Sequence, residues 1–426
     1  MTARHPHHGH HAGRGTGGRN VERSQGPLKG LVVIDLSRAL AGPHAAMLLG
    51  DLGARVIKVE QPGRGDETRG WGPPFVGPEE ERISTYFLSC NRNKESIELD
   101  LKSDDGAAQL TRLVRAADVL VENFRPGVLD RLGFPTRRLE ELNPRLVVCS
   151  ISGFGHDGPE GGRAGYDQIA QGEAGLMSLT GPSPKEPTKT GVAIGDLLAG
   201  MNGAQGVLAA LVERERTGRG RVVRTSLLSS IVGVHAFQGT RWTVGREVPT
   251  ALGNQHPSIA PYGAFACMDG VLQVAVGGEA QWERFAGLLG LDPRDPRFGD
   301  NASRVEHREE LVAEVEAVLG RGSRDEWLRR IGEAGVPCGA VRTIDQVYEW
   351  EQTRSQGLLA RVEHPVLGEI ELPGSALRFD PVVDGEPETP GTGYLPPPGL
   401  GEHNDAVRAW LDEVESGLAS EGASAH

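Results

Sequence analysis

The segment G-V-A-I-G-D-L-L-A-G, residues 191–200, places the carboxylate of Asp196 where a glycine-containing turn meets a predicted helix. That helix is predicted because apolar residues recur at spacings of three and four along residues 196–214 and so form one face. These residues are Leu197, Met201, Ala204, Leu208 and Leu211. Asp196 could cap the helix, which is worth ~0.5–2 kcal/mol. It could equally be a covalent nucleophile toward an activated acyl group, since Gly195 leaves it accessible. This segment alone leaves both interpretations open.

Two further segments carry residues suited to a polyanionic ligand. V-E-N-F-R-P-G, residues 121–127, follows a predicted strand, where ligands of doubly wound sheets bind. There Arg125 could bind phosphate and Phe124 could stack on a purine, or the segment is an ordinary loop. In S-C-N-R-N-K, residues 89–94, Arg92 and Lys94 could bind the same ligand or form a solvated turn.

Metal chemistry is not expected. His156 and His256 lie in predicted loops without a second ligand at metal spacing. The cysteines, Cys90, Cys149, Cys267 and Cys338, are far apart and show no C-x-x-C spacing, which argues against a zinc ribbon or a disulfide scaffold. With no apolar signal-peptide core, we expect a cytoplasmic location.

Composition excludes several classes of function. The chain has 426 residues, with 58 acidic residues against 45 Lys and Arg, and a net charge of −13. Such an acidic chain is a poor general binder of nucleic acid. It also lacks the run of ~18 apolar residues that a membrane-spanning helix needs. We therefore expect neither nucleic acid nor a membrane as a partner.

Alternating strands and helices predict a doubly wound, Rossmann-like α/β domain. Its strands are expected at residues 31–36, 54–59, 118–122 and 146–151. The first turn reads S-R-A-L-A-G-P-H, without the G-x-G-x-x-G of dinucleotide-binding proteins, so binding of NAD or FAD is not expected. A second, smaller α+β domain is expected around the strand 272–276. The predicted division is a disordered His-rich arm (1–26), the large domain (27–227), a linker (228–251), the small domain (252–340), a return linker with the C-terminal part of the large domain (341–414), and a tail (415–426).

Taken in order, these segments resemble the class III CoA-transferase family. The similarity spans roughly residues 27–410 and includes D-L-S-R-A-L-A-G-P, N-R-N-K-E-S-I-E-L-D, V-E-N-F-R-P-G, A-G-Y-D-Q-I-A-Q-G-E-A-G and G-V-A-I-G-D-L-L-A-G. The resemblance implies a Rossmann-like large domain, an inserted small domain and an interlocked homodimer. It makes Asp196 the nucleophile. It further implies an active-site loop at Gly253, Asn254, Gln255 and His256, and contacts to CoA or substrate from Ala41, Cys90, Asn91, Arg92, Asn93, Asn123, Phe124, Arg125, Arg131, Arg163, Ala164, Gly165 and Tyr166.

The chemistry implied by the resemblance moves CoA from an acyl-CoA, with succinyl-CoA as a candidate donor, to a free carboxylic acid. Asp196 would form an acyl anhydride and then an aspartyl-CoA thioester, with no cofactor beyond CoA itself. Backbone N–H groups that stabilise the oxyanions are expected at the start of the helix and in the loop 253–262. Formyl-CoA transferases carry Gln and Arg where this chain has Leu40 and Gln61, which argues against formyl or oxalyl specificity.

Two other functions compete with this one. The racemases of the family carry His at the position of Tyr166, and an unperturbed phenol with a pKa of about 10 is a poor proton shuttle at neutral pH. A non-catalytic CoA-binding subunit is the second alternative, against which the intact Asp196 argues.

Overall fold

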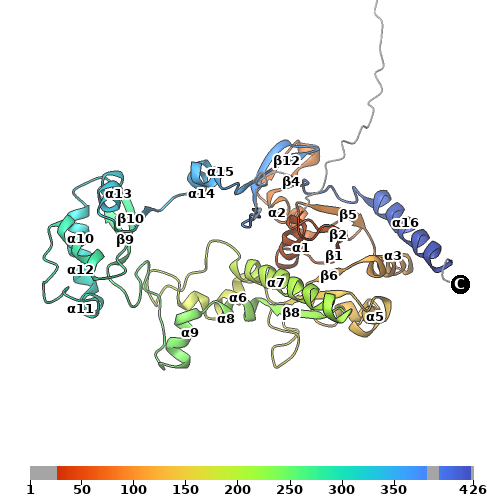
Figure 1. Cartoon of the computed structure of the whole chain (residues 1–426), viewed down its shortest axis with the longest axis horizontal. Helices are drawn as coiled ribbons and strands as arrows, with labels where there is room; N and C mark the ends of the chain where they lie inside the picture. Colours follow the sequence, from red (N-terminus) through yellow and green to blue (C-terminus); the bar gives the residue numbers. More distant parts are fainter. Residues whose placement is uncertain (1–25, 381–392, 424–426) are drawn as a thin grey trace, which may run out of the picture.

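The computed structural model describes residues 26–380 and 393–423. Two bodies are joined by two separate stretches of chain (Figure 1). The larger one contains a six-stranded sheet, and the smaller one a three-stranded sheet. The predicted His-rich arm lies outside the described residues, apart from Gly26.

The six-stranded sheet is parallel throughout and has the order β5-β2-β1-β6-β7-β8. Its strands are β1 (Val32–Asp35), β2 (Arg55–Glu60), β5 (Lys94–Glu98), β6 (Val119–Glu122), β7 (Val147–Ser152) and β8 (Val222–Ser226). Counted along the chain, this is the 3-2-1-4-5-6 order of the Rossmann fold. The order reverses between β1 and β6, so the loops after these two strands diverge and leave a crevice at their carboxyl ends.

Helices cover both faces of this sheet (Figure 1). On one face lie α1 (Ala41–Asp51) and α7 (Ile194–Thr217), which share a buried core with the strands. The helices pack so closely that a Cβ at Gly200 would lie 2.7 Å from the backbone oxygen of Ala41. On the other face lie α3 (Asp104–Ala116), α5 (Thr136–Leu142) and α16 (Asn404–Ala423). The start of α7, which carries Asp196, is therefore fixed against α1.

The smaller body is an antiparallel sheet with helices packed on it. Its strands, in the order β11-β10-β9, are β9 (Tyr262–Cys267), β10 (Gly270–Ala275) and β11 (Cys338–Ala340). The helices are α10 (Glu279–Leu289), α11 (Asn301–Glu306), α12 (Arg308–Leu319) and α13 (Arg324–Glu333). Trp282, Phe285 and Phe298 are buried in a core separate from those of the large sheet.

The remaining elements are short. They are η1 (Glu67–Gly70), β3 (Phe75–Val76), η2 (Glu79–Glu81), β4 (Ile83–Ser84), α2 (Thr85–Ser89), α4 (Val128–Arg131), α6 (Asp167–Glu173), η3 (Leu176–Ser178), α8 (Leu227–Gly233), α9 (Ala236–Thr243), α14 (Ile344–Glu349), α15 (Glu351–Ser355), β12 (Leu359–His364) and β13 (Gly368–Pro373). Across the described ranges, no helix combines the length and apolar character needed to cross a bilayer.

Two expectations about local structure need correction. The predicted linker 228–251 contains most of α8 and all of α9. The predicted tail from 415 is helical as far as Ala423, because α16 begins earlier and anchors on the sheet through the buried side chains of Val407 and Leu411.

Candidate active site at the switch point of the sheet

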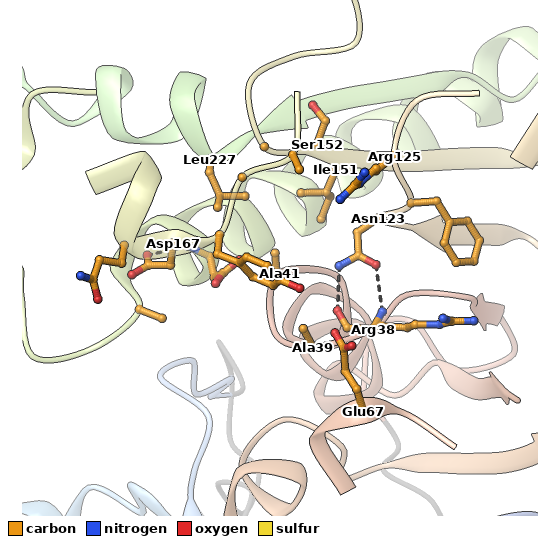
Figure 2. A pocket seen from close by; sticks show the side chains of 18 of the residues that line it. Arg38, Ala39, Ala41, Glu67, Asn123, Arg125, Ile151, Ser152, Asp167 and Leu227 are labelled. Atoms are coloured by element: carbon orange, nitrogen blue, oxygen red, sulfur yellow. Dashed lines mark hydrogen bonds between the residues drawn. The ribbon is translucent and has the colours of Figure 1, made fainter. Parts of the chain in front are cut away.

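A cavity of about 530 Å³ opens where the strand order reverses (Figure 2). It is lined by the loop after β1, the loop after β6, the end of β7 and the starts of α6 and α7. Its volume is within the ~300–1,000 Å³ usual for small-molecule sites. The geometry of the fold therefore places a ligand-sized cavity where an open α/β sheet binds its ligand.

Asn123 joins the two diverging loops. Its side-chain oxygen accepts the N–H of Arg38 at 2.8 Å, and its amide donates to the Arg38 carbonyl at 2.7 Å (Figure 2). The guanidinium of Arg38 lies 5.6 Å from the centre of the Phe124 ring. Asn123, which is predicted to contact the ligand, therefore also links the two loops that line the cavity.

Two buried lysines stabilise the turn after β1 through hydrogen bonds and ion pairs. Lys94 binds Asp35 at 2.9 Å and donates to the Pro43 carbonyl at 2.8 Å. Lys58 donates to the Ser37 carbonyl at 2.9 Å and pairs with Asp66 at 2.8 Å. Both ammonium groups are enclosed by protein, so the interpretation of Lys94 as a charge for an external polyanion is wrong.

Asp196 lies in the first turn of α7 but does not cap it. The helix begins at Ile194. Its N-cap residue, Ala193, makes no side-chain hydrogen bond to the helix. The carboxylate of Asp167 does the capping, because its Oδ1 accepts the N–H groups of Gly195 at 2.7 Å and of Asp196 at 3.4 Å. The capping interpretation of Asp196 is therefore wrong. The N–H groups expected to serve as oxyanion donors at this helix start are already occupied.

Asp167 is itself held in place by a buried amide. Gln171 donates to the second carboxylate oxygen of Asp167 at 2.6 Å. The side-chain oxygen of Gln171 accepts the N–H of Thr190 at 2.9 Å, and the Gln171 side chain is fully buried. Gln171 thus ties the start of α6 to the turn that leads into α7.

The surroundings of Asp196 favour its neutral form. Burial, followed by the charge of Asp167, raises the pKa of Asp196 to about 7. Throughout the described ranges, no side chain donates a hydrogen bond to its carboxylate. A poorly solvated carboxylate of raised basicity, facing a cavity, has the properties of a nucleophile.

Cations surround the same cavity. Arg38, Arg125 and Lys189 line it together with Arg163, which pairs with Glu160 and Glu173 and lies 4.5 Å from the Phe154 ring centre. Sequence reasoning did not single out Arg38 or Lys189. Arg38 could have been predicted as a site residue, because it follows β1 and lies at the carboxyl end of a strand where the strand order reverses.

The structure brings half of the predicted site residues to this cavity. These are Ala41, Asn123, Phe124, Arg125, Arg163, Ala164, Gly165, Tyr166 and Asp196. It also adds aromatic and acidic side chains that sequence reasoning missed, namely Glu67, Trp71, Tyr86 and Asp167.

Other predicted residues lie elsewhere. Cys90, Asn91, Arg92 and Asn93 are buried and do not line the cavity. The Arg92 guanidinium contacts Asp51 at 2.5 Å and the Pro373 carbonyl at 2.6 Å, so its charge is neutralised by a partner inside the fold. Arg131 is exposed in α4, outside the cavity lining. Gly253, Asn254, Gln255 and His256 line a different cavity of about 530 Å³ beside β9, β10 and β11.

Metal binding finds no support in the described ranges, where no cluster of three or more His, Cys, Asp or Glu side chains could hold an ion. Fold and site together define an α/β protein that presents a buried carboxylate of raised pKa in a cation-lined cavity.

Comparisons with known proteins give the family. A model described as CoA-transferase family III matches residues 28–404. The chain is 39% identical to succinyl-CoA:glutarate CoA-transferase of Mus musculus, covering 92% of this chain and 87% of that protein. It is 38% identical to succinate–glutarate CoA-transferase of Agrobacterium fabrum, with coverages of 91% and 96%. A crystal structure of a CaiB/BaiF family protein from Brucella suis superposes with a TM-score of 0.80 at 39% identity, covering 91% of this chain and 99% of that one.

The chain belongs to CoA-transferase family III. The predicted family, the mixed α/β fold and the enzyme class, a CoA-transferase, are confirmed. Enzymes of this class act on an acyl-CoA and a carboxylate, and coenzyme A is carried by the substrate.

Proposed function

We propose that this chain moves CoA from succinyl-CoA to a second dicarboxylic acid, with Asp196 as the covalent nucleophile. The observation that carries the proposal is the Asp196 carboxylate, which is free of hydrogen bonds from the described residues in a cavity lined by Arg38, Arg125 and Lys189. The relatives named for transfer between succinyl-CoA and glutarate support the choice of substrates.

The reaction proceeds in four exchanges at Asp196. Its carboxylate attacks the thioester carbonyl, and CoA leaves as a thiolate while an aspartyl anhydride forms. The thiolate attacks the aspartyl carbonyl, which releases the donor acid and leaves an aspartyl-CoA thioester. The acceptor carboxylate then repeats the two exchanges in reverse. One thioester replaces another, so the overall change in free energy is small.

The residues of the β6 loop bind the CoA moiety. Arg125 offers a planar guanidinium to the phosphates, and Phe124 offers a ring face to the adenine. Arg163 and Tyr166 also line the cavity and complete the binding site.

The working form is an interlocked homodimer in the cytoplasm. Two stretches of chain join the two bodies (Figure 1), which is the connection that a ring threaded through a partner subunit requires. Large apolar side chains lie exposed near α9 in the single chain: Trp242 is 50% exposed, Val244 79% and Val248 68%. Burying such a patch against a second copy removes it from water. The loop Gly253–His256, which does not reach Asp196 within one chain, would complete the site of the partner.

The test is a transfer assay with a panel of acceptors. Succinyl-CoA is incubated with glutarate, oxalate, acetate or a branched monocarboxylate, and new acyl-CoA is quantified. We expect transfer to dicarboxylates, and its loss in Asp196→Asn. Deuterium incorporation at C2 of a 2-methylacyl-CoA without CoA transfer would instead establish a racemase. Binding of acyl-CoA without turnover would establish a non-catalytic subunit.

A further inference from the structure

Tyr86 is held rigidly at the edge of the active-site cavity. It lies in α2, where the Ser84 hydroxyl accepts the N–H of Tyr86 at 3.2 Å and donates to the Trp71 carbonyl at 2.5 Å. The Tyr86 ring meets the Trp71 ring edge to face, with 4.9 Å between ring centres. Backbone and ring are therefore fixed independently of any ligand.

The same side chain packs against the start of α7. Tyr86 joins a small apolar cluster built on Leu40, Met47 and Cys90. Ala193 and Leu197, which flank Asp196 in the chain, pack against the same cluster. Tyr86 and Asp196 both line the cavity, so the phenol and the carboxylate face a common space.

The phenol is equipped to donate a hydrogen bond and keep its proton. Burial, followed by the charge of Asp196, raises the pKa of Tyr86 above its ordinary value. Within residues 26–380 and 393–423, its hydroxyl forms no hydrogen bond. The O–H group is thus protonated at working pH and available to a ligand.

The reaction needs such a donor because the nearest backbone donors are occupied. Attack on the aspartyl carbonyl places negative charge on a carbonyl oxygen, and that charge requires preorganised donors. The N–H groups of Gly195 and Asp196 already donate to Asp167. A side-chain donor that lines the same cavity as Asp196 supplies what the helix start does not.

We propose that Tyr86 is a catalytic residue whose phenol O–H stabilises the oxyanion formed at the Asp196 carbonyl carbon. This inference rests on the proposed function. The CoA thiolate forms a C–S bond to that carbon, and the carbonyl electron pair moves onto oxygen, where Tyr86 donates. The carbonyl then re-forms and the C–O bond to the donor acid breaks, so the acid leaves as a carboxylate. One anion enters and one leaves, and the phenol proton stays on Tyr86.

The test is the Tyr86→Phe variant, which keeps the ring and its contact with Trp71. We expect kcat for CoA transfer to fall on the order of 10²-fold, as it does when one oxyanion donor is removed, while KM for succinyl-CoA stays within about twofold. Tyr348→Phe removes an identical hydroxyl from α14, outside the cavity lining, and serves as the matched control. A rise in KM with kcat unchanged would overturn the proposal, because Tyr86 would then be a wall of the binding site.

A second measurement separates this proposal from the proposed function. The aspartyl-CoA thioester is reduced with borohydride at short times, and the alcohol formed at position 196 is quantified by mass spectrometry. We expect wild-type enzyme to accumulate it quickly and Tyr86→Phe slowly. Equal rates in both proteins would refute the role of Tyr86 and leave the function intact. Absence of both adduct and transfer in the wild type would refute the function itself.

Discussion

The carboxylate of Asp167 accepts the backbone N–H of Asp196 at 3.4 Å and that of the preceding Gly195 at 2.7 Å. One carboxylate thus begins the helix that carries the other. Its negative charge also lies close enough to oppose ionisation of Asp196. The same group, Asp167, therefore positions the Asp196 carboxylate and raises its pKa.

Asp167→Asn should shift the acid limb of the pH–rate profile. The pKa of Asp196 is about 7, raised by burial and then by Asp167, and attack requires the ionised form. An Asn oxygen can still cap the helix, but the charge is gone, so the midpoint of kcat/KM should move to lower pH. Glu67→Gln removes a carboxylate from the same cavity that does not contribute to this shift. An unchanged midpoint in Asp167→Asn, or an equal shift in Glu67→Gln, would contradict the assignment.

Asp196→Asn should stabilise the fold at alkaline pH. The folded-state pKa of Asp196, about 7, lies above the ordinary 3.8. Burying this carboxylate therefore costs almost nothing below pH 4; the cost grows as pH rises from 4 to 7 and is constant above the folded-state pKa. We expect the Tm of Asp196→Asn to exceed that of wild type at pH 8.5 and to approach it below pH 4. A Tm difference that does not change with pH would count against the raised pKa.

Arg125 and Arg131 should differ in their effect on acyl-CoA binding. Arg125 lines the cavity, whereas Arg131 lies on α4 away from it. Arg125→Ala should raise KM for acyl-CoA several-fold, with a smaller effect on kcat, because a phosphate contact contributes to binding in every state. Arg131→Ala serves as the matched charge control. Steady-state kinetics at low and moderate salt measure both, and equal KM values for the two variants would place the CoA site elsewhere.

Arg92→Met should lower the free energy of unfolding. The guanidinium is 2% exposed and pairs with Asp51, so its removal leaves a buried carboxylate without its partner. Such losses cost ~3–5 kcal/mol, whereas replacing both partners by apolar residues is often neutral. Denaturant unfolding of Arg92→Met and of Arg92→Met with Asp51→Leu measures the difference. Reduced acyl-CoA affinity at full stability would instead restore Arg92 as a ligand contact.

Most strands of the parallel sheet could be predicted from the sequence. The apolar runs 31–36, 54–59, 118–122 and 146–151 coincide closely with β1, β2, β6 and β7, because parallel strands buried on both faces are apolar throughout. The hairpin β12–β13 was missed. Its strands lie in a segment that looks rich in Pro and Gly, although apolar and charged residues alternate along Leu359–His364 as in a half-buried strand.

The candidate site was readable only in part. Asp196, Asn123 and Arg125 follow strand ends or begin a helix, so topology alone brings them together. The role of Asp167 and the burial of Arg92 depend on partners 28 and 41 residues away, at Gly195 and Asp51. Local sequence does not encode such pairings. Arg92 next to Lys94 in an acidic chain looked like an anion site, although each charge is neutralised inside the fold.

The central claim, that Asp196 carries CoA covalently, is tested most directly by mass spectrometry after borohydride reduction. The enzyme is incubated with succinyl-CoA and no acceptor, reduced, and cleaved with trypsin, which releases residues 190–214 as one peptide. We expect the reduced alcohol at position 196 in wild type and none in Asp196→Asn. Active transfer with an unmodified Asp196, or with the adduct on another side chain, would contradict the account.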